Sequence, residues 1–325
     1  MKAIVLKEIG APENLILTEI PIPSIQEDEV LVKVKAIGVN PVDAFVRRTK
    51  EAFDWVYQYK GTEENIILGW DVAGVVTQVG KSVTRLNVGD EVFGNFKFIG
   101  QANAYAEFVA APEKEMILKP SNISFEEAAG ATMAALTAWV SVIDHGKVKK
   151  GDKIIIHGAS GGVGHYAIQF AKHFGAHVIA VASEVNKDFV LGLGADEFID
   201  YKTQNFEEIV TDADIVHDTV WSDDVNHIER SLKALKPGGK LLSLIVYPDA
   251  EFIEKAKKDK NIDVIRVNVR YPEENYFEDM QAIAKLLELG IVKTHISQIF
   301  SLEDMHKAHA AIQSKNTVGK IIVKP

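Results

Sequence analysis

The stretch IIIHGASGGVGHYAIQFAKHFGAHVIAVAS, residues 154–183, decides the fold, because a strand pattern, a glycine turn and a helix pattern follow one another in it. Glycines let a backbone turn tightly and approach a pyrophosphate, and the N-terminus of the next helix offers free N–H groups. Gly161 and Gly164 hold the second and third positions of the usual fingerprint, while Ala159 replaces the first glycine. Alanine is small enough for this turn if its φ is negative. The stretch therefore predicts a dinucleotide-binding turn.

The residues after this stretch continue the alternation of strands and helices. Helical segments at 162–174 and 223–235 lie between apolar runs, which read KIIIHGA, HVIAVAS, EFIDY, DIVHDTV, KLLSLIV and DVIRVNV. Strands separated by helices of this length indicate a parallel, doubly wound sheet. Six strands in this order predict a complete α/β Rossmann domain.

The end of the second strand bears on which dinucleotide binds. NAD-binding enzymes place an acidic residue about 20 residues beyond the glycines, where it bonds the adenosine ribose. Ser183 stands at that distance, and its hydroxyl tolerates a 2′-phosphate that Lys187 would pair with. Glu184 is one residue away, and a carboxylate at the ribose would favour NADH. The pattern favours NADPH and leaves NADH as the alternative.

The flanking segments differ from this central part. The first 120 residues hold short runs typical of strands, broken by turn signals, which predicts a barrel-like antiparallel domain. Residues 124–146 predict one helix, with a capping box at Ser124 and Glu127. The tail predicts a helix, a strand, a second helix and a last strand, and it could return to complete the first domain.

Composition narrows the function classes. The 325 residues carry a formal net charge of −10, which disfavours nucleic acid as a partner. The chain has no cysteine, so disulfides, thiol nucleophiles and thiolate zinc sites are excluded. The longest nearly apolar run, residues 128–143, is shorter than the about 18 residues of a membrane span. The first residues have charges and no unbroken apolar core, so we expect a cytoplasmic protein without a membrane partner.

Two histidine patterns are read as structural. His217 and Asp218 are adjacent on a predicted strand and would point to opposite faces, which argues against a catalytic dyad. His306 and His309 are one turn apart on a predicted helix, and we expect a surface face rather than a metal site.

The whole chain resembles the zinc-free quinone oxidoreductase branch of the medium-chain dehydrogenase/reductase superfamily, the group that includes zeta-crystallin. The motifs that carry the resemblance are AIGVNPVDAFVRR, GWDVAGVVTQVG, VGDEVFG, AYAEFV, AAGATMAALTAW, HGASGGVGHYAIQFAK, LGADEFIDY, LKPGGKLL and GKIIV. The resemblance implies a GroES-like catalytic domain, residues 1–121 completed by 290–325, and a Rossmann domain at 122–289. The nicotinamide would lie between them, and homodimers are common in such relatives. The apolar strand DVIRVNV would permit dimerisation through the sheet edge.

The resemblance also implies the site residues. Asn40 and Asp43 match positions on the nicotinamide and substrate side. Cofactor contacts are implied at Thr132, Thr137, Ser160, Gly161, Gly162, Val163, Ser183, Lys187, Tyr201, Thr219, Val220, Ile245 and Val246. Relatives often carry tyrosine where this chain has Phe45, so a tyrosine-assisted protonation is not expected. Aromatic residues at 53, 55, 57 and 59 would either wall a substrate pocket or pack in the core.

No metal is expected. Zinc-dependent members of the superfamily use Cys, His-Glu and a further Cys or Asp, but the corresponding stretches here hold Asn40 and Trp70-Asp71. Asp71 alone cannot supply a four-coordinate zinc site.

These observations together predict an NADPH-dependent, metal-free enzyme that transfers hydride to quinones or α,β-unsaturated carbonyls. Hydrogen bonds from Asn40 or backbone N–H groups would stabilise the developing negative charge. Asp43 would position the loop or bond a ribose or amide rather than act as a base. The alternatives are an enoyl-thioester reductase and a nucleotide-binding protein with little turnover, crystallin-like or RNA-associated.

Overall fold

The computed structural model describes residues 1–220, 226–268 and 275–325. The chain forms two compact units. Unit one comprises Met1–Leu136 and Arg270–Pro325, and unit two comprises Thr137–Val269. Each unit is described by itself.

Unit two is built on a six-stranded sheet in which every neighbouring pair is parallel. The strand order is β10-β9-β8-β11-β12-β13. The bounds are β8 Lys153–His157, β9 His177–Ala182, β10 Glu197–Asp200, β11 Ala213–Asp218, β12 Leu235–Ser243 and β13 Asp263–Arg266. This order is that of the Rossmann fold, so the predicted doubly wound sheet is confirmed.

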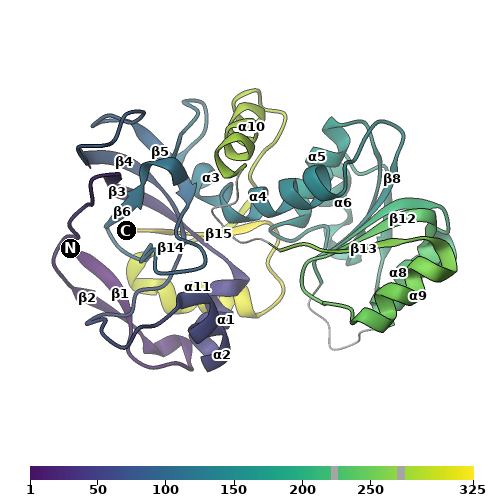
Figure 1. Ribbon diagram of the computed structural model, residues 1–325, viewed down its shortest axis with the longest axis horizontal. Coiled ribbons are helices and arrows are strands. Elements are labelled where there is room, and N and C mark those ends of the chain that lie inside the picture. Colours follow the sequence, from purple (N-terminus) through teal and green to yellow (C-terminus); the bar gives the residue numbers. More distant parts are fainter. Residues whose placement is uncertain (221–225, 269–274) are drawn as a thin grey trace. The chain divides into compact units, whose positions relative to one another are not determined.

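Helices cover this sheet, with α5 and α6 on one side and α8 and α9 on the other (Figure 1). The helices of the unit are α5 Gly164–His173, α6 Lys187–Gly192, α7 Phe206–Ile209, α8 Asn226–Ala234 and α9 Ala250–Lys260. The central strand β8 reads KIIIH, and its three isoleucines are fully buried. A strand covered on both faces needs such a continuous apolar run.

Unit one contains a small antiparallel sheet, β1 Lys2–Leu6 with β2 Leu15–Glu19, and a larger sheet in the order β14-β15-β3-β4-β5-β7. The larger sheet comprises β3 Glu29–Val39, β4 Asp71–Val79, β5 Glu91–Asn95, β6 Phe108–Pro112, β7 Ile117–Leu118, β14 Ile296–Ser301 and β15 Lys320–Lys324, with β6 also paired to β3. Its pairs are antiparallel except β14 with β15. The predicted GroES-like, mainly antiparallel domain is confirmed.

The two chain ends belong to unit one but to different sheets, β1 to the small one and β15 to the larger one. Strand β15 pairs with the C-terminal end of β3, at Ile37–Val39, so the C-terminal segment lies within unit one (Figure 1). Helices α3 Phe125–Gly130 and α10 Tyr276–Glu288 also pack in unit one, α3 against β3 and β4 and α10 against β7. Along the sequence, the divisions between the two units fall at 136/137 and 269/270.

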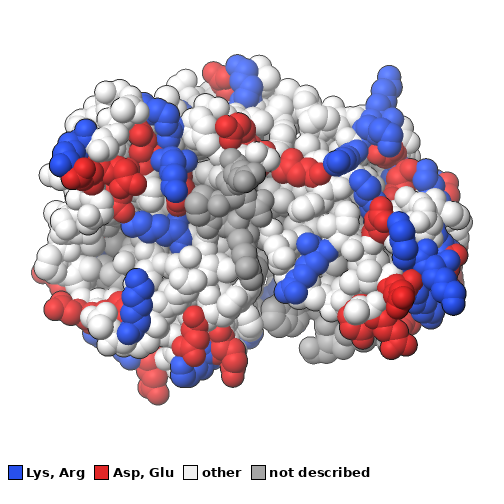
Figure 2. Space-filling view, viewed as in Figure 1, with Lys and Arg blue, Asp and Glu red and all other residues white. Residues whose placement is uncertain are grey.

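The remaining helices of unit one are α1 Pro41–Arg48, α2 Lys50–Ala52 and α11 Met305–Gln313, with a π-helical turn η2 at Phe53–Tyr57. The helix α4, Met133–Trp139, spans the boundary between the units and continues as η4, Val140–His145. In the part that the structure describes, no helix is long and apolar enough to cross a membrane. Acidic and basic side chains alternate over the face shown in Figure 2.

The single helix predicted at 124–146 is wrong in one respect, because it is interrupted between α3 and α4. The capping box is present: Glu127 N–H donates to Ser124 Oγ (3.1 Å) and Ser124 N–H to Glu127 Oε2 (2.8 Å). At the break, Thr132 Oγ1 donates to the Ala129 carbonyl (2.8 Å), and Met133 N–H donates to Asp71 Oδ1 (3.4 Å). The interruption between α3 and α4 thus involves a contact with a distant strand.

Candidate functional site

The turn between β8 and α5 is built around two glycines that no other residue could replace without strain. Gly158 has a φ of +66°, and Gly161 N–H donates to its carbonyl oxygen (2.9 Å). A Cβ on Gly164 would lie 2.2 Å from the same oxygen, so only glycine lets α5 start this close to the strand. The left-handed position is therefore Gly158 rather than Ala159.

Ala159 fits the turn without strain. It is fully buried, it does not have a positive φ, and its N–H donates to the Val181 carbonyl (3.2 Å). Its side chain is small enough for this packing. The condition set from the sequence, that φ of Ala159 must be negative, is met, so alanine at this position is compatible with a dinucleotide turn.

The turn exposes the donors that a pyrophosphate needs. Among the described residues, the N–H groups of Gly162 and Val163 have no hydrogen-bond partner, and they stand at the N-terminus of the ten-residue helix α5. Free N–H groups and the helix dipole together favour an anion. The geometry fits the pyrophosphate of a dinucleotide, held by Ser160, Gly161, Gly162 and Val163.

Hydrogen bonds connect the end of β9 to this turn. Asn186 Nδ2 donates to Ser160 Oγ (3.0 Å) and to Ser183 Oγ (3.3 Å), so it joins the turn to the ribose-side strand end. Glu184 is exposed and its Oε1 lies 3.4 Å from Lys187 Nζ. Sequence reasoning missed Asn186, although a short amide side chain three residues after Ser183 is the signal that could have found it.

Lys187 and Tyr201 lie at the exposed rim of this region. The Lys187 ammonium is 5.5 Å from the centre of the Phe198 ring, and Tyr201 is 60% exposed with Lys202 Nζ 6.0 Å from its ring. Both residues follow strands β9 and β10, which are neighbours. The basic and aromatic side chains expected at a 2′-phosphate are therefore accessible at one end of the sheet.

The predicted residues after β11 and β12 lie at the same edge, because the strands are parallel. Thr219 Oγ1 donates to the His157 carbonyl (3.0 Å), and Val220 N–H to Asp218 Oδ1 (2.8 Å). Ile245 is 39% exposed, and Val246 packs partly against the apolar core. The structure thus brings together along one sheet edge every predicted cofactor residue from 160 to 246.

The His217 and Asp218 side chains do not form a dyad. Asp218 Oδ2 lies 2.9 Å from Nε2 of His227 instead, and both of these side chains are buried. His217 is fully buried, and burial lowers its pKa to about 4. It is a neutral core residue, and the lack of a hydrogen bond between its ring and Asp218 agrees with the predicted opposite orientation of adjacent strand side chains.

Unit one holds a buried polar cluster, which we call the Asp71 network: Asn40, Asp43, Asp71, Asn95 and Lys320. Asp71 Oδ2 accepts from Asn40 Nδ2 and its Oδ1 from Asn95 Nδ2, both at 2.7 Å. Lys320 Nζ donates to Asn40 Oδ1 at 2.5 Å and to the Val39 carbonyl at 3.3 Å. An amide thus stands between a carboxylate and an ammonium.

Burial and charge oppose each other in this network. Burial raises the pKa of Asp71 and lowers that of Lys320, while the attraction between the two groups acts the other way on each. Asp43 Oδ2 accepts from Asn40 N–H (2.7 Å) at the start of α1. Burial raises the pKa of Asp43 to about 7, although this hydrogen bond lowers it. Asp43 is therefore a carboxyl that changes charge near neutral pH.

The Asp71 network does not fit a zinc ion. Its carboxylate oxygens are bonded to amides, and the nearby cation is the Lys320 ammonium. Zinc would need several imidazole, thiolate or free carboxylate ligands. Within the described ranges there is no group of three His, Cys, Asp or Glu side chains that could hold a metal.

The two predicted threonines lie near the start of α4. Thr132 is fully buried beside Asp71, and its hydroxyl donates to the Ala129 carbonyl. Thr137 is buried on α4 itself and belongs to unit two. Thr132 thus lies with the Asp71 network in unit one, and Thr137 lies in the unit that holds the glycine turn.

The aromatic segment after α1 divides into core and surface. Phe53 and Tyr57 are buried and stacked, with ring centres 5.1 Å apart, while Trp55 is 52% and Tyr59 43% exposed. Phe45 is half-buried on α1. For Phe53 and Tyr57, core packing rather than a substrate wall is the structural role.

The prediction for His309 was wrong. His306 is half-buried, but His309 is fully buried and hydrogen-bonded to Arg47 and Tyr105. Its partners are more than 200 residues away in the sequence, so helical spacing could not reveal them.

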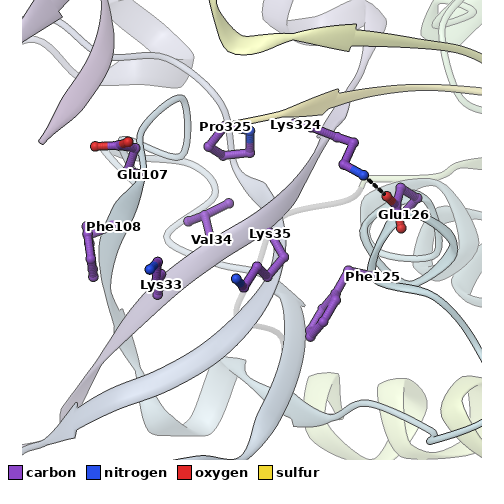
Figure 3. Close-up of a pocket in the computed structure, with 9 residues that line it drawn as sticks. All are labelled: Lys33, Val34, Lys35, Glu107, Phe108, Phe125, Glu126, Lys324 and Pro325. Carbon is purple, nitrogen blue, oxygen red and sulfur yellow. Dashed lines mark ion pairs between the residues drawn. The ribbon is translucent and has the colours of Figure 1, made fainter.

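A cavity of about 440 Å³ opens elsewhere in unit one (Figure 3). Lysines from β3 and β15 and the chain end surround it, and its lining is Lys33, Val34, Lys35, Glu107, Phe108, Phe125, Glu126, Lys324 and Pro325. Lys324 Nζ pairs with Glu126 Oε1 at 2.6 Å. None of the predicted site residues lines this cavity, so it is not the candidate site.

Comparison with known proteins gives one family match in the N-terminal part of the chain and one in the C-terminal part. Residues 26–121 match the family model described as alcohol dehydrogenase GroES-like domain, and residues 193–323 match the one described as zinc-binding dehydrogenase. The chain is 34% identical to a 2-methylene-furan-3-one reductase of Solanum lycopersicum, over all of this chain and 79% of that protein. It is 33% identical to the chloroplastic NADPH-dependent alkenal/one oxidoreductase of Arabidopsis thaliana, over all of this chain and 80% of that one.

A solved structure extends this likeness to three dimensions. The quinone oxidoreductase from Coxiella burnetii superposes with a TM-score of 0.89 at 33% identity, covering all of this chain and 99% of that one. Similarity over nearly the full length of both chains covers both units.

Proposed function

We propose that this chain, which belongs to the zinc-free quinone oxidoreductase branch of the medium-chain dehydrogenase/reductase superfamily, is an NADPH-dependent reductase of quinones or α,β-unsaturated carbonyls. The observation that carries the proposal is the β8–α5 turn, whose free N–H groups at Gly162 and Val163 stand at a helix N-terminus. The names of the relatives supply the acceptor class.

The nucleotide-binding residues we propose are those along the carboxyl edge of the unit-two sheet. Gly162 and Val163 would bind the pyrophosphate, and Ser183, Lys187 and Tyr201 would bind the 2′-phosphate. The other contacts proposed are Thr132, Thr137, Ser160, Gly161, Thr219, Val220, Ile245 and Val246. The NADPH-dependent alkenal/one oxidoreductase among the relatives supports NADPH rather than NADH.

When bound, NADPH supplies the hydride that the acceptor takes up. Asn40 and Asp43 are the residues we propose on the substrate side. The Asn40 amide has two N–H groups, and Asp71 takes one of them, so the other would donate to an acceptor oxygen as negative charge develops. The Lys320 ammonium on Asn40 Oδ1 polarises the amide and makes it a stronger donor.

Asp43 fixes this donor rather than transferring a proton. Its carboxylate holds the backbone N–H of Asn40 and so sets where the amide lies. The developing anion of a quinone or enone is delocalised, and its proton would come from solvent. The residues of the chain therefore need only bind, orient and stabilise charge.

The test is to mix the purified protein with NADPH or NADH and to follow the absorbance of reduced nicotinamide with quinones, enones and enoyl-thioesters. We expect NADPH oxidation with quinones or enones and slower oxidation of NADH. Tight NADPH binding without oxidation by any acceptor would contradict the enzyme proposal. Faster turnover with enoyl-thioesters would replace the proposed substrate class.

We propose further that the GroES-like catalytic domain is residues 1–121 with 290–325, and that 122–289 is the dinucleotide domain. We also propose a cytoplasmic homodimer. Strand β13, which ends the sheet order of unit two, supports association through that edge, and the absence of cysteine suits a reducing compartment. Light scattering of the purified protein and cell fractionation test these two points.

A further inference from the structure

Three buried side chains of unit one, from distant parts of the sequence, form a hydrogen-bonded row. Arg47 Nε on α1 donates to His309 Nδ1 on α11 (3.1 Å), and His309 Nε2 lies 2.9 Å from the Tyr105 hydroxyl. All three residues are fully buried. We call this row the Arg47–His309–Tyr105 chain.

The direction of the hydrogen bonds in this chain is determined by chemistry. A guanidinium can only donate, so His309 Nδ1 must be the acceptor and the ring proton must be on Nε2. Nε2–H then donates to the Tyr105 oxygen. Burial lowers the pKa of His309 to about 3, so the ring is neutral and has no second proton. The hydroxyl proton of Tyr105 must therefore point to a different acceptor.

Asp43 offers that acceptor. Each of the two side chains shifts the pKa of the other: Tyr105 lowers that of Asp43, and Asp43 raises that of Tyr105. Asp43 Oδ2 already accepts from the Asn40 N–H. Its Oδ1 is buried and has no hydrogen-bond partner in the part of the chain that the structure describes. Oδ1 is thus the oxygen left to accept from the Tyr105 hydroxyl.

Two further features hold the chain in place. The Arg47 guanidinium also donates to the Gly10 carbonyl and to Gln313 Oε1, which fixes it from a loop and from α11. Gly69 has a φ of +89°, and a Cβ there would lie 2.3 Å from Cδ1 of the Tyr105 ring. A glycine is therefore required for the ring to lie where it does.

We propose that Tyr105 and His309 are positioning residues for Asp43: the Arg47–His309–Tyr105 chain aims one hydroxyl proton at the carboxyl that holds Asn40. The proposal depends on the proposed function in one respect only, namely that Asp43 and Asn40 lie on the substrate side. Other charged groups that act on Asp43 are Asp71 on β4 and Lys320 on β15, which raise and lower its pKa respectively. Tyr105 adds a neutral donor to these two charges.

The principal test is Tyr105→Phe, with the titration of Asp43 followed by carbon-13 NMR of labelled carboxyl groups and assigned with Asp43→Asn. Loss of the donor should raise the pKa of Asp43 by about one unit, a tenfold change in proton affinity. Tyr276→Phe is the matched control, because that buried hydroxyl accepts from the Asn95 backbone N–H and donates to the Glu115 carbonyl. An unchanged pKa in folded Tyr105→Phe would overturn the proposal.

A second measurement needs no folded variant of Tyr105. Nitrogen-15 NMR of the wild-type protein should show His309 with its proton on Nε2 and with Nδ1 unprotonated at neutral pH. The opposite tautomer would reverse the chain and refute the proposal. His309→Gln, which can accept and donate in the same order, should keep the Asp43 pKa closer to wild type than His309→Leu does.

These readouts do not depend on turnover. If the protein reduces no acceptor while Asp43 responds to Tyr105→Phe as expected, the reaction is wrong and the positioning role holds. If turnover is observed while the pKa of Asp43 does not change in Tyr105→Phe, the proposed reaction holds and the positioning role is wrong.

Discussion

In the proposed reaction the β8–α5 turn binds the dinucleotide and the Asp71 network lies on the substrate side, but the two sites are formed in different ways. The turn is local: its donors and its required glycines lie within Gly158–Gly164 and act mostly through backbone atoms. The network is made of side chains, and the bond between Asn40 and Lys320 joins residues 280 positions apart. One site depends on backbone conformation and the other on the folding of the whole unit.

This difference implies different responses to mutation. A backbone site fails when a side chain or charge enters it, even if the unit stays folded. A buried network of charges fails by destabilising the unit, because removal of one partner leaves another charge uncompensated. The predictions below test this distinction.

The largest effect is expected for Lys320→Met. The substitution removes the ammonium that the Asn40 amide links to Asp71, and a buried charge left without compensation costs about 3–5 kcal/mol in the free energy of unfolding. The loss should be greater at pH 8 than at pH 5, because the carboxyls are more fully ionised at the higher pH. Chemical denaturation at both pH values measures it.

Lys324→Met is the control on the same strand. Its ion pair with Glu126 is half-exposed, so the expected change is below about 1 kcal/mol. The double variant Lys320→Met/Asp71→Asn should regain part of the stability that the single variant loses. Equal losses for Lys320→Met and Lys324→Met would show that the network is not held together by charge.

Gly161→Asp tests the turn. A Cβ there would lie 3.2 Å from the Gly158 oxygen, a contact that a small shift can relieve, but the carboxylate would repel a pyrophosphate. We expect NADPH affinity to fall about a hundredfold, corresponding to about 2.8 kcal/mol, with little change in stability. Fluorescence titration of NADPH and thermal unfolding measure the two quantities.

Gly192→Asp is the matched control, because it adds the same charge to unit two at an exposed glycine with open space around it. Its NADPH affinity should stay near wild type. If Gly161→Asp instead binds NADPH normally, the turn does not hold the pyrophosphate.

The same difference between local and long-range contacts explains which features could be predicted from the sequence. The alternating strands of unit two and the glycine turn follow from local patterns, and the structure agrees with them. The residues expected along the sheet edge came mainly from the family resemblance and remain a proposal. The row from Arg47 to His309 was missed, and His309 was assigned to the surface, because a helical pattern reports which residues share a face and not what that face meets. The break between α3 and α4 was missed because a helical pattern does not report the contacts made there, such as that of Met133 N–H with Asp71.

Asp43 gives the network a pH dependence that the turn lacks. Its pKa is about 7 in the folded protein and 3.8 when unperturbed, so the folded state binds more protons between these values. The contribution of Asp43 to the free energy of unfolding should therefore be greatest below pH 4. It should fall by about 1 kcal/mol per pH unit as the pH rises towards 7. Between pH 5 and 7 the expected loss is about 2 kcal/mol.

Denaturation curves of wild type and Asp43→Asn at several pH values isolate this contribution. The asparagine cannot ionise, so the difference between the two proteins should change with pH over that range and level off above it. A constant difference would mean that Asp43 does not take up a proton near neutral pH.

Ser183→Asp should have the smallest effect and tests the side-chain part of the nucleotide site. A carboxylate at the end of β9 would repel a 2′-phosphate and accept hydrogen bonds from a free ribose, so the ratio of NADPH to NADH affinity should fall about tenfold, or about 1.4 kcal/mol. Val185→Asp adds the same charge two residues on, at a side chain that is 87% exposed, and should shift the ratio less. Equal shifts would mean that net charge near the strand end sets the preference. A ratio unchanged in Ser183→Asp would place the ribose elsewhere, and the backbone turn alone would then carry the binding of the dinucleotide.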